Sequence, residues 1–213
     1  PTRKHYINKL RKLKWRNSMA MLFLAQGVPL VWSGDEIGNS QQGNNNAYCQ
    51  DNPVGWVNWK NEKTHRREIH YLEQLAQFRR EHPIVANEMP FQFSDYRSYG
   101  SPDLSFHGES AWILEPSEGR MALGMMYNGA YSTDERYTED VYVAYNFYSA
   151  ASTLALPKLE KDKHWYLVLD TSDDKTPFLE KPVLQEQGNI VLRAQSICVL
   201  VGKSDAKEGK GCT

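Results

Sequence analysis

The 213 residues have an ordinary globular composition, with 40% hydrophobic and 24% charged side chains and room for one large or two small domains. The formal net charge is -1, and basic and acidic residues are interspersed, which argues against nucleic acid as a partner. Three widely spaced cysteines predict no disulfide framework and favour a reducing compartment, the cytoplasm. No Cys/His cluster has zinc-ligand spacing, and we expect neither a metal nor another cofactor.

The first predicted element is a helix over residues 5–26, where apolar residues recur at helical spacing. Gly27 suits a C-cap, and Pro29 prevents the helix from resuming. The apolar run 19–32 is too short and too interrupted to span a bilayer, so no membrane partner is expected.

A buried strand is predicted next, because residues 28–33 form a short apolar run without alternation. The polar turn 34–36 follows, which completes an α/β unit of the kind that binds ligands at the end of its strand. Residues 37–60 are then rich in Asn, Gln, Gly and Asp and carry several aromatic residues. Loops of this length inside compact domains are commonly functional.

A second amphipathic helix is predicted over residues 64–81, ended by Pro83, and the His82 imidazole can satisfy a carbonyl at that end. Beyond it, short runs rich in β-branched and aromatic residues alternate with turn residues, which predicts an antiparallel sandwich. The runs are residues 111–114, 121–127, 141–147, 164–170 and 190–201.

Residues 26–38, QGVPLVWSGDEIG, resemble the eighth barrel strand of the α-amylase superfamily, glycoside hydrolase family 13. Residues 39–52, NSQQGNNNAYCQDN, together with Trp56 and Trp59, are similar to the bacterial glycogen-debranching enzymes and their isoamylase and pullulanase relatives. The resemblance is close over about residues 5–90. Beyond that, the chain resembles the family's C-terminal β-domain only in the order of its elements.

This resemblance implies an α+β chain in three parts. Residues 1–83 would be the last β/α portion of a (β/α)8 TIM barrel, residues 84–203 an antiparallel β-sandwich, and residues 204–213 a disordered tail. The first residues, Pro1-Thr2-Arg3, contain no initiator Met and suggest an excised segment.

The resemblance also implies hydrolysis of α-1,6-glucosidic branch linkages in glycogen or related α-glucans, by two carboxylates acting in a retaining mechanism. In the family those carboxylates come from earlier strands, and their motifs do not occur in this sequence. No residue is therefore assigned as catalytic, and we expect the 213-residue chain alone to be inactive.

The loop over residues 37–60 offers amide, carboxylate and aromatic groups, which suit the wall of a glucan cleft. The candidate substrate-binding residues are Asn44, Asn45, Asn46, Tyr48 and Asp51. The alternative is that the Asn triplet forms Asx turns that hold the loop, with Tyr48 packed beneath it.

Asp35 and Glu36 are adjacent carboxylates at the end of the predicted strand. Consecutive side chains of an extended segment point to opposite faces, so we expect these two to brace loops near the cleft rather than to act on one bond. Trp56 and Trp59 are predicted core or interdomain anchors, and Cys49 a small packed residue.

Apolar surface on an incomplete barrel favours association. We therefore expect either a homodimer or packing against the chain's own β-domain for four side chains, Leu22, Phe23, Val31 and Trp32. Two other functions stay open: a non-catalytic carbohydrate-binding or structural β-module, and another superfamily activity such as pullulanase, isoamylase or α-amylase.

Overall fold

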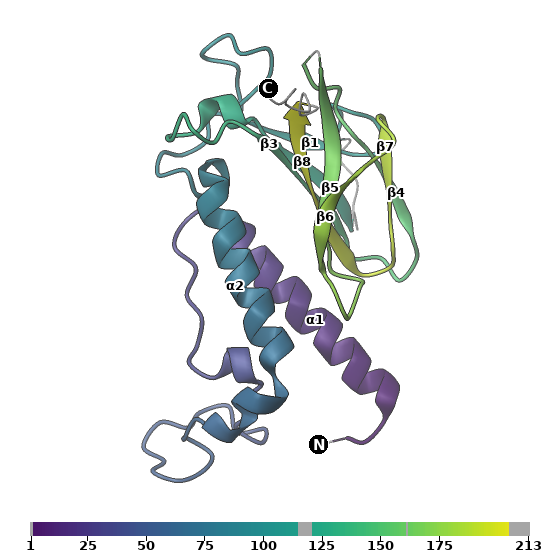
Figure 1. Ribbon diagram of the computed structural model, residues 1–213. Coiled ribbons are helices and arrows are strands. Elements are labelled where there is room, and N and C mark those ends of the chain that lie inside the picture. Colours follow the sequence, from purple (N-terminus) through teal and green to yellow (C-terminus); the bar gives the residue numbers. More distant parts are fainter. Residues whose placement is uncertain (1, 115–120, 161, 205–213) are drawn as a thin grey trace, which may run out of the picture.

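The computed structural model describes residues 2–114, 121–160 and 162–204. Two helices come first, and a six-stranded antiparallel sheet and a two-stranded sheet follow (Figure 1). The elements are α1 (His5–Leu24), α2 (Arg66–Glu81), β1 (Leu104–His107), β2 (Ala122–Tyr127), β3 (Asp140–Asn146), β4 (Ser152–Ala155), β5 (Lys163–Asp170), β6 (Phe178–Leu184), β7 (Asn189–Leu192) and β8 (Ser196–Ser204). The larger sheet has the order β1-β2-β3-β8-β5-β6, and β4 pairs with β7.

The central strands β3 and β8 bury side chains on both faces of the larger sheet. Successive residues of a strand point to opposite faces, so each strand contributes to two hydrophobic cores. One core lies between the sheet and the helices and contains Val141, Val143, Tyr145, Ile197, Val199 and Val201. The other lies between the sheet and the β4–β7 pair and contains Tyr142, Ala144, Cys198 and Leu200.

The helices present one face each to the sheet. In α1 the buried residues are Arg16, Asn17, Ala20 and Leu24, and in α2 they are Tyr71, Leu75 and Phe78. Apart from the adjacent pair Arg16 and Asn17, they follow one another at spacings of three or four, as on one face of a helix. Phe178 of β6 lies against both Tyr71 and Phe78, with ring centroids 5.9 and 6.3 Å away. This aromatic row anchors α2 at the edge of the sheet.

Polar groups add a second attachment of α1 to the strands. Arg16 Nε donates to the carbonyl of Thr171 at 3.0 Å, and Asn17 Nδ2 donates to the carbonyl of Gln195 at 2.7 Å. The hydroxyl of Tyr71 donates to the Arg16 carbonyl at 3.2 Å, which ties the two helices together. Burial lowers the pKa of Arg16 from its ordinary value.

The C-terminus of α1 is closed by a side chain of α2. Arg79 Nη1 donates to the carbonyls of Phe23 and Ala25, both at 2.7 Å, and Nη2 donates to the carbonyl of Gly27. These contacts supply donors for carbonyls that a helix end leaves unpaired. The predicted C-cap at Gly27 is wrong by two residues: α1 ends at Leu24 and is capped by Ala25, while Gly27 has a left-handed φ of 99° beyond it.

Residues 28–33 do not form the predicted strand. Val28, Leu30 and Trp32 are 94%, 87% and 71% exposed, and no strand is assigned to this segment. A strand requires neighbours that pair with its backbone, and the described residues supply none at this place. Of the four apolar residues expected to associate, Phe23 packs against the helix-side core, whereas Trp32 is exposed.

The β-region is antiparallel as predicted, but its strands differ in detail. Residues 111–114 form only an isolated bridge, between Ser110 and Ile113, and residues 190–201 divide into β7 and β8. Strands β1, β4 and β6 were not predicted. The second sheet has two strands, so the sandwich is strongly unequal. Of the predicted tail, Ser204 ends β8 and residues 205–213 lie outside the described part.

His82 closes the C-terminus of α2, as predicted. Its Nδ1 lies 2.9 Å from the carbonyl oxygen of Phe78, and its ring stacks on that of Phe78. Its Nε2 lies 3.2 Å from Glu139, which also faces Lys203 at 3.6 Å. The hydrogen bond from His82 is the main reason that the pKa of Glu139 is lowered, and the charge of Lys203 adds to it.

Arg79→Ala should remove three donors from the end of α1 and leave its carbonyls unpaired. Hydrogen bonds to charged groups contribute roughly 1.5–3 kcal/mol each, and partial exposure lowers that figure, so we expect a loss of about 2 kcal/mol. Urea unfolding measures this loss. The matched control is Arg80→Ala, because Arg80 is exposed on the same helix. Equal effects of the two substitutions would contradict the assigned role of Arg79.

Glu139→Gln should make the melting temperature depend less on pH in the acidic range. Because the folded-state pKa of Glu139 is lowered, its contribution is present above the ordinary pKa near 4.5 and is lost as pH falls through the folded value. We expect wild type to melt above Glu139→Gln at pH 7 and the two melting temperatures to converge towards pH 3. Glu135→Gln, an exposed control in the same connection, should show no such convergence. A difference between the melting temperatures of wild type and Glu139→Gln that grows as pH falls would refute the stabilising role of the Glu139 carboxylate.

Candidate functional site

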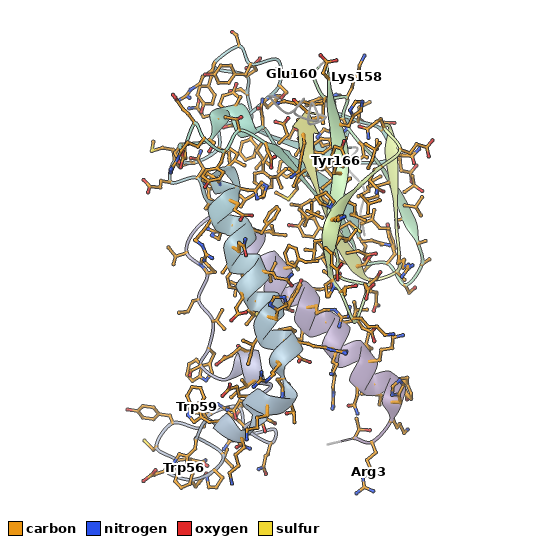
Figure 2. The ribbon with its side chains drawn as sticks, in the orientation of Figure 1. Arg3, Trp56, Trp59, Lys158, Glu160 and Tyr166 are labelled. Carbon is orange, nitrogen blue, oxygen red and sulfur yellow. The ribbon has the colours of Figure 1, made fainter. Side chains whose placement is uncertain are left out.

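The amide-rich loop over residues 37–60 lies at the end of the helix pair that is remote from the sheet (Figure 1). It begins at a short 3-10 helix, Asp35–Ile37, and ends in a second one, Trp59–Thr64, which leads into α2. Figure 2 shows Trp56 and Trp59 at this end of the molecule. The loop is therefore placed by the helices and not by the β-region.

Asparagine side chains hold the backbone of the loop. Asn44 Oδ1 accepts the N–H of Asn46 at 2.9 Å, and Asn46 Oδ1 accepts the N–H of Tyr48 at 3.1 Å. These are the Asx turns offered as the alternative role of the triplet. Asn45 is exposed, and the ring of Tyr48 is 84% exposed rather than packed beneath the loop.

Trp56 and Trp59 are 54% and 65% exposed, so neither is a core anchor among the described residues, and their role as interdomain anchors stays a prediction. The expectation that Cys49 is packed is wrong, because Cys49 is exposed. Asp51 Oδ1 accepts the indole N–H of Trp56 at 2.9 Å, which fixes the orientation of that ring. The loop thus holds exposed aromatic rings beside amide and carboxylate groups.

A cavity of about 380 Å³ lies beside the loop. Trp56, Asn39, Asn58 and Asn61 contribute to its lining, whereas the five predicted substrate-binding residues do not. The N–H of Asn58 donates to Asn39 Oδ1 at 3.3 Å and joins the two ends of the loop. The sequence analysis did not single out Asn39 and Asn58 as site residues. The signal that could have identified them is that an amide side chain stands near each end of the same loop.

Asp35 and Glu36 lie in the turn that precedes the loop. Glu36 Oε2 accepts the N–H of Gly34 at 2.9 Å, and the indole of Trp15 donates to the Asp35 carbonyl at 3.2 Å. Burial, with a smaller effect of the Glu36 charge, raises the pKa of Asp35. Gly34 has φ 104°, and a Cβ there would come within 2.7 Å of Asn39, so the turn requires glycine.

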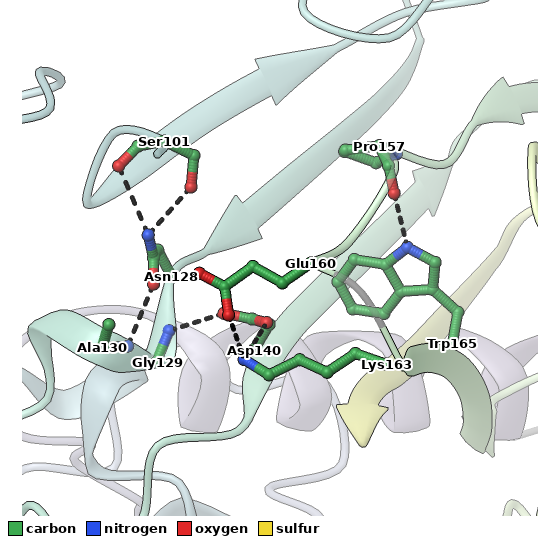
Figure 3. A network of polar contacts seen from close by, with 9 residues as sticks. All are labelled: Ser101, Asn128, Gly129, Ala130, Asp140, Pro157, Glu160, Lys163 and Trp165. Atoms are coloured by element: carbon green, nitrogen blue, oxygen red, sulfur yellow. Dashed lines mark hydrogen bonds and ion pairs between the residues drawn. The ribbon is translucent and has the colours of Figure 1, made fainter. Parts of the chain in front are cut away.

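A second polar cluster lies in the β-region beside a cavity of about 630 Å³ (Figure 3). Asn128 Nδ2 donates to Ser101 Oγ at 2.8 Å, and Asp140 accepts the N–H of Gly129 at 3.0 Å. Lys163 lies 3.2 Å from the Asp140 carboxylate and opposes the rise that burial gives to its pKa. These groups satisfy one another, so the cluster braces the β-region.

The described residues contain neither a group of metal ligands nor a membrane-spanning helix. Among the described residues, no three His, Cys, Asp or Glu side chains are grouped as metal ligands. Within the same ranges, no helix combines the length and the apolar character needed to cross a bilayer.

Comparison with known proteins identifies the region. A family model described as "Isoamylase, C-terminal" matches residues 111–201. Isoamylase 1 of Arabidopsis thaliana is 30% identical over 168 residues, which are 78% of this chain and 19% of the relative. The glycogen debranching enzyme of Pectobacterium carotovorum subsp. carotovorum strain PC1 is 30% identical over 184 residues, 86% of this chain and 24% of the relative.

Solved structures agree on the fold. The pullulanase of Bacillus acidopullulyticus superposes with a TM-score of 0.65 at 21% identity, over 90% of this chain and 20% of that one. The chain thus spans about a quarter or less of these relatives, and the comparisons give no support to a homodimer. The chain is homologous to the C-terminal region of the isoamylase, glycogen-debranching and pullulanase group of glycoside hydrolase family 13.

Proposed function

We propose that this chain is part of a debranching enzyme that hydrolyses α-1,6-glucosidic linkages in glycogen or related α-glucans in the cytoplasm. Relatives named isoamylase and glycogen debranching enzyme support the substrate class. The reaction needs a nucleophile and a general acid about 5 Å apart in the retaining form. We place both carboxylates in the larger part of the protein that this chain does not span.

The observation that carries the proposal is the exposed loop with its aromatic rings and amides. Tyr48 is 84% exposed, and Trp56 contributes to a cavity of about 380 Å³. Sugars are bound by aromatic rings against their apolar faces and by planar amides and carboxylates at their hydroxyls. Exposed aromatic rings that are grouped beside a cavity are typical of a ligand-binding surface.

The exposed segment 28–33 supports the position of this loop. Its apolar side chains Val28, Leu30 and Trp32 lack cover within the described residues. In a longer protein we assign them to the eighth strand of a (β/α)8 barrel, where neighbouring strands would bury them. The loop would then lie at the C-terminal face of that barrel, where such folds bind their substrates.

The residues of the loop divide into two roles under this proposal. Asn45 and Tyr48 contact glucan directly, since both are exposed. Asn44 and Asn46 use their carbonyl oxygens in turns and keep their NH2 groups as donors for hydroxyl oxygens. Asp51 positions Trp56, while Asp35 and Glu36 brace the turn before the loop.

A second candidate function is that of a pullulanase. It is favoured by the shared fold of a type I pullulanase from Bacillus subtilis, solved with maltose, which superposes with a TM-score of 0.66 at 20% identity over 90% of this chain. A non-catalytic carbohydrate-binding module is the remaining alternative, and it requires no further part of the protein.

The full-length protein that contains this chain should release reducing ends from glycogen limit dextrin, and the 213-residue chain alone should not. A reducing-sugar assay on limit dextrin, pullulan and linear maltooligosaccharides separates the candidates. Preference for pullulan would favour the second candidate. Cleavage of linear α-1,4 chains only, or activity of the chain alone, would refute the proposal.

Tyr48→Ala in that full-length protein should lower kcat/KM on limit dextrin by about tenfold, the equivalent of roughly 1.4 kcal/mol of lost ring contact. Tyr6→Ala is the matched control, because Tyr6 is 67% exposed in α1 and lies outside the loop. Melting temperatures should be equal for both variants. Full activity of Tyr48→Ala would remove Tyr48 from the substrate-binding set.

A further inference from the structure

A cavity of about 270 Å³ lies between the helices and the connection from β5 to β6. Its lining comes from α1, from α2 and from residues 174–180. Three aromatic residues contribute to it: Trp15, Tyr71 and Phe178. It shares no lining residue with the loop over residues 37–60, so it is a separate candidate site.

Arg16 is the unusual residue of this cavity. Its side chain lines the cavity although the residue is 7% exposed. Nε donates to the Thr171 carbonyl, and among the described residues this is the one hydrogen bond of the guanidinium. Nη1 and Nη2 therefore have no protein acceptor there. Neither atom is among the buried polar atoms that lack a partner, so both are reached by solvent, and the hydroxyl groups of a ligand can take the place of water there.

Charges of both signs surround Arg16 in this cavity. Lys12, Arg67 and Lys175 line it together with Glu68, Asp174 and Glu180. Glu68 pairs with Lys12 at 3.2 Å, and no ion pair is formed with Arg16 among the described residues. A neutral ligand with hydroxyl groups suits such a mixed lining, because hydroxyls accept from the guanidinium and donate to the carboxylates.

The aromatic rings supply the remaining part of the recognition. The Trp15 and Tyr71 rings lie 6.0 Å apart, and Tyr71 in turn contacts Phe178. Tyr71 is 3% exposed and lies behind the wall, so the partly buried rings of Trp15 and Phe178 supply the apolar surface of the cavity. An apolar surface beside paired donors and acceptors matches a hexose, which has C–H faces and vicinal hydroxyls. The volume is near the lower limit of ligand pockets, which restricts the occupant to about one sugar unit.

We propose that this cavity binds one glucosyl unit of an α-glucan as an anchoring site that takes no part in bond cleavage. The choice of glucose among the hexoses rests on the proposed debranching function. The fit of a hexose to the cavity rests only on the lining residues. A polymer held at two places on one molecule gains effective concentration at the second place. The site would thus retain a glycogen particle while the loop engages a branch.

Titration of the 213-residue chain with maltotriose, followed by nuclear magnetic resonance, tests the proposal. We expect saturable shifts of the Trp15 indole N–H and the Gln74 side-chain amide, with a Kd of about 1 mM, as for a shallow single-sugar site. Inorganic phosphate should leave both signals in place. Shifts with phosphate alone, shifts confined to residues 37–60, or no saturation at roughly tenfold higher maltotriose would each overturn the proposal.

Arg16→Lys keeps the charge but loses the paired Nη donors, and should weaken maltotriose binding about tenfold. Arg66→Lys, one residue before the cavity-lining part of α2, is the matched control and should bind like wild type. If Arg16→Lys fails to fold, Glu68→Gln, which removes a carboxylate acceptor, should weaken binding several-fold relative to Glu73→Gln. Unchanged affinity in Glu68→Gln and in folded Arg16→Lys would overturn the assignment, whatever the hydrolysis assay of the full-length protein shows.

Discussion

Burial of β3 and β8 on both faces is the constraint on which the rest of the structure depends. Each strand places alternate residues in two cores, so a helix layer must cover one face and a second sheet the other. Tyr142 illustrates how closely the second layer fits: a Cβ at Gly124 would lie 1.8 Å from its hydroxyl oxygen. The helices therefore bury apolar side chains of the sheet as well as of each other.

The far end of the helix pair is built on a different principle. Away from the sheet, few apolar side chains are covered by the described residues, and hydrogen bonds from the backbone to asparagine side chains hold the loop in place of a core. Such bonds fix the path of the backbone and leave side chains in solvent. The same feature that denies Tyr48, Trp56 and Trp59 a packing role leaves their rings free to meet a ligand.

Sequence reasoning succeeded where one local signal fixed the outcome. Helical spacing predicted α1 and α2, and β-branched runs predicted β2, β3 and β5, because burial imposes those patterns. It missed β6, whose residues Glu180, Lys181 and Pro182 are exposed at the sheet edge and show no burial pattern. It placed a strand at residues 28–33, where the apolar run is present but pairing partners are not. For Trp56, hydrophobicity could not reveal the bond to Asp51 that holds it outside a core.

The two candidate carbohydrate sites are connected by the helix pair. The helix pair is held by Arg79 at one end and by the Tyr71–Arg16 contact in its middle, and it carries the loop and one wall of the Arg16 cavity. Because the same pair is fixed to the sheet through Phe178 and Thr171, the separation of loop and cavity does not depend on a flexible linker. The β-region thus does more than cover the helices, because residues 174–180 supply the third wall of the cavity and tie it to the helices that carry the loop.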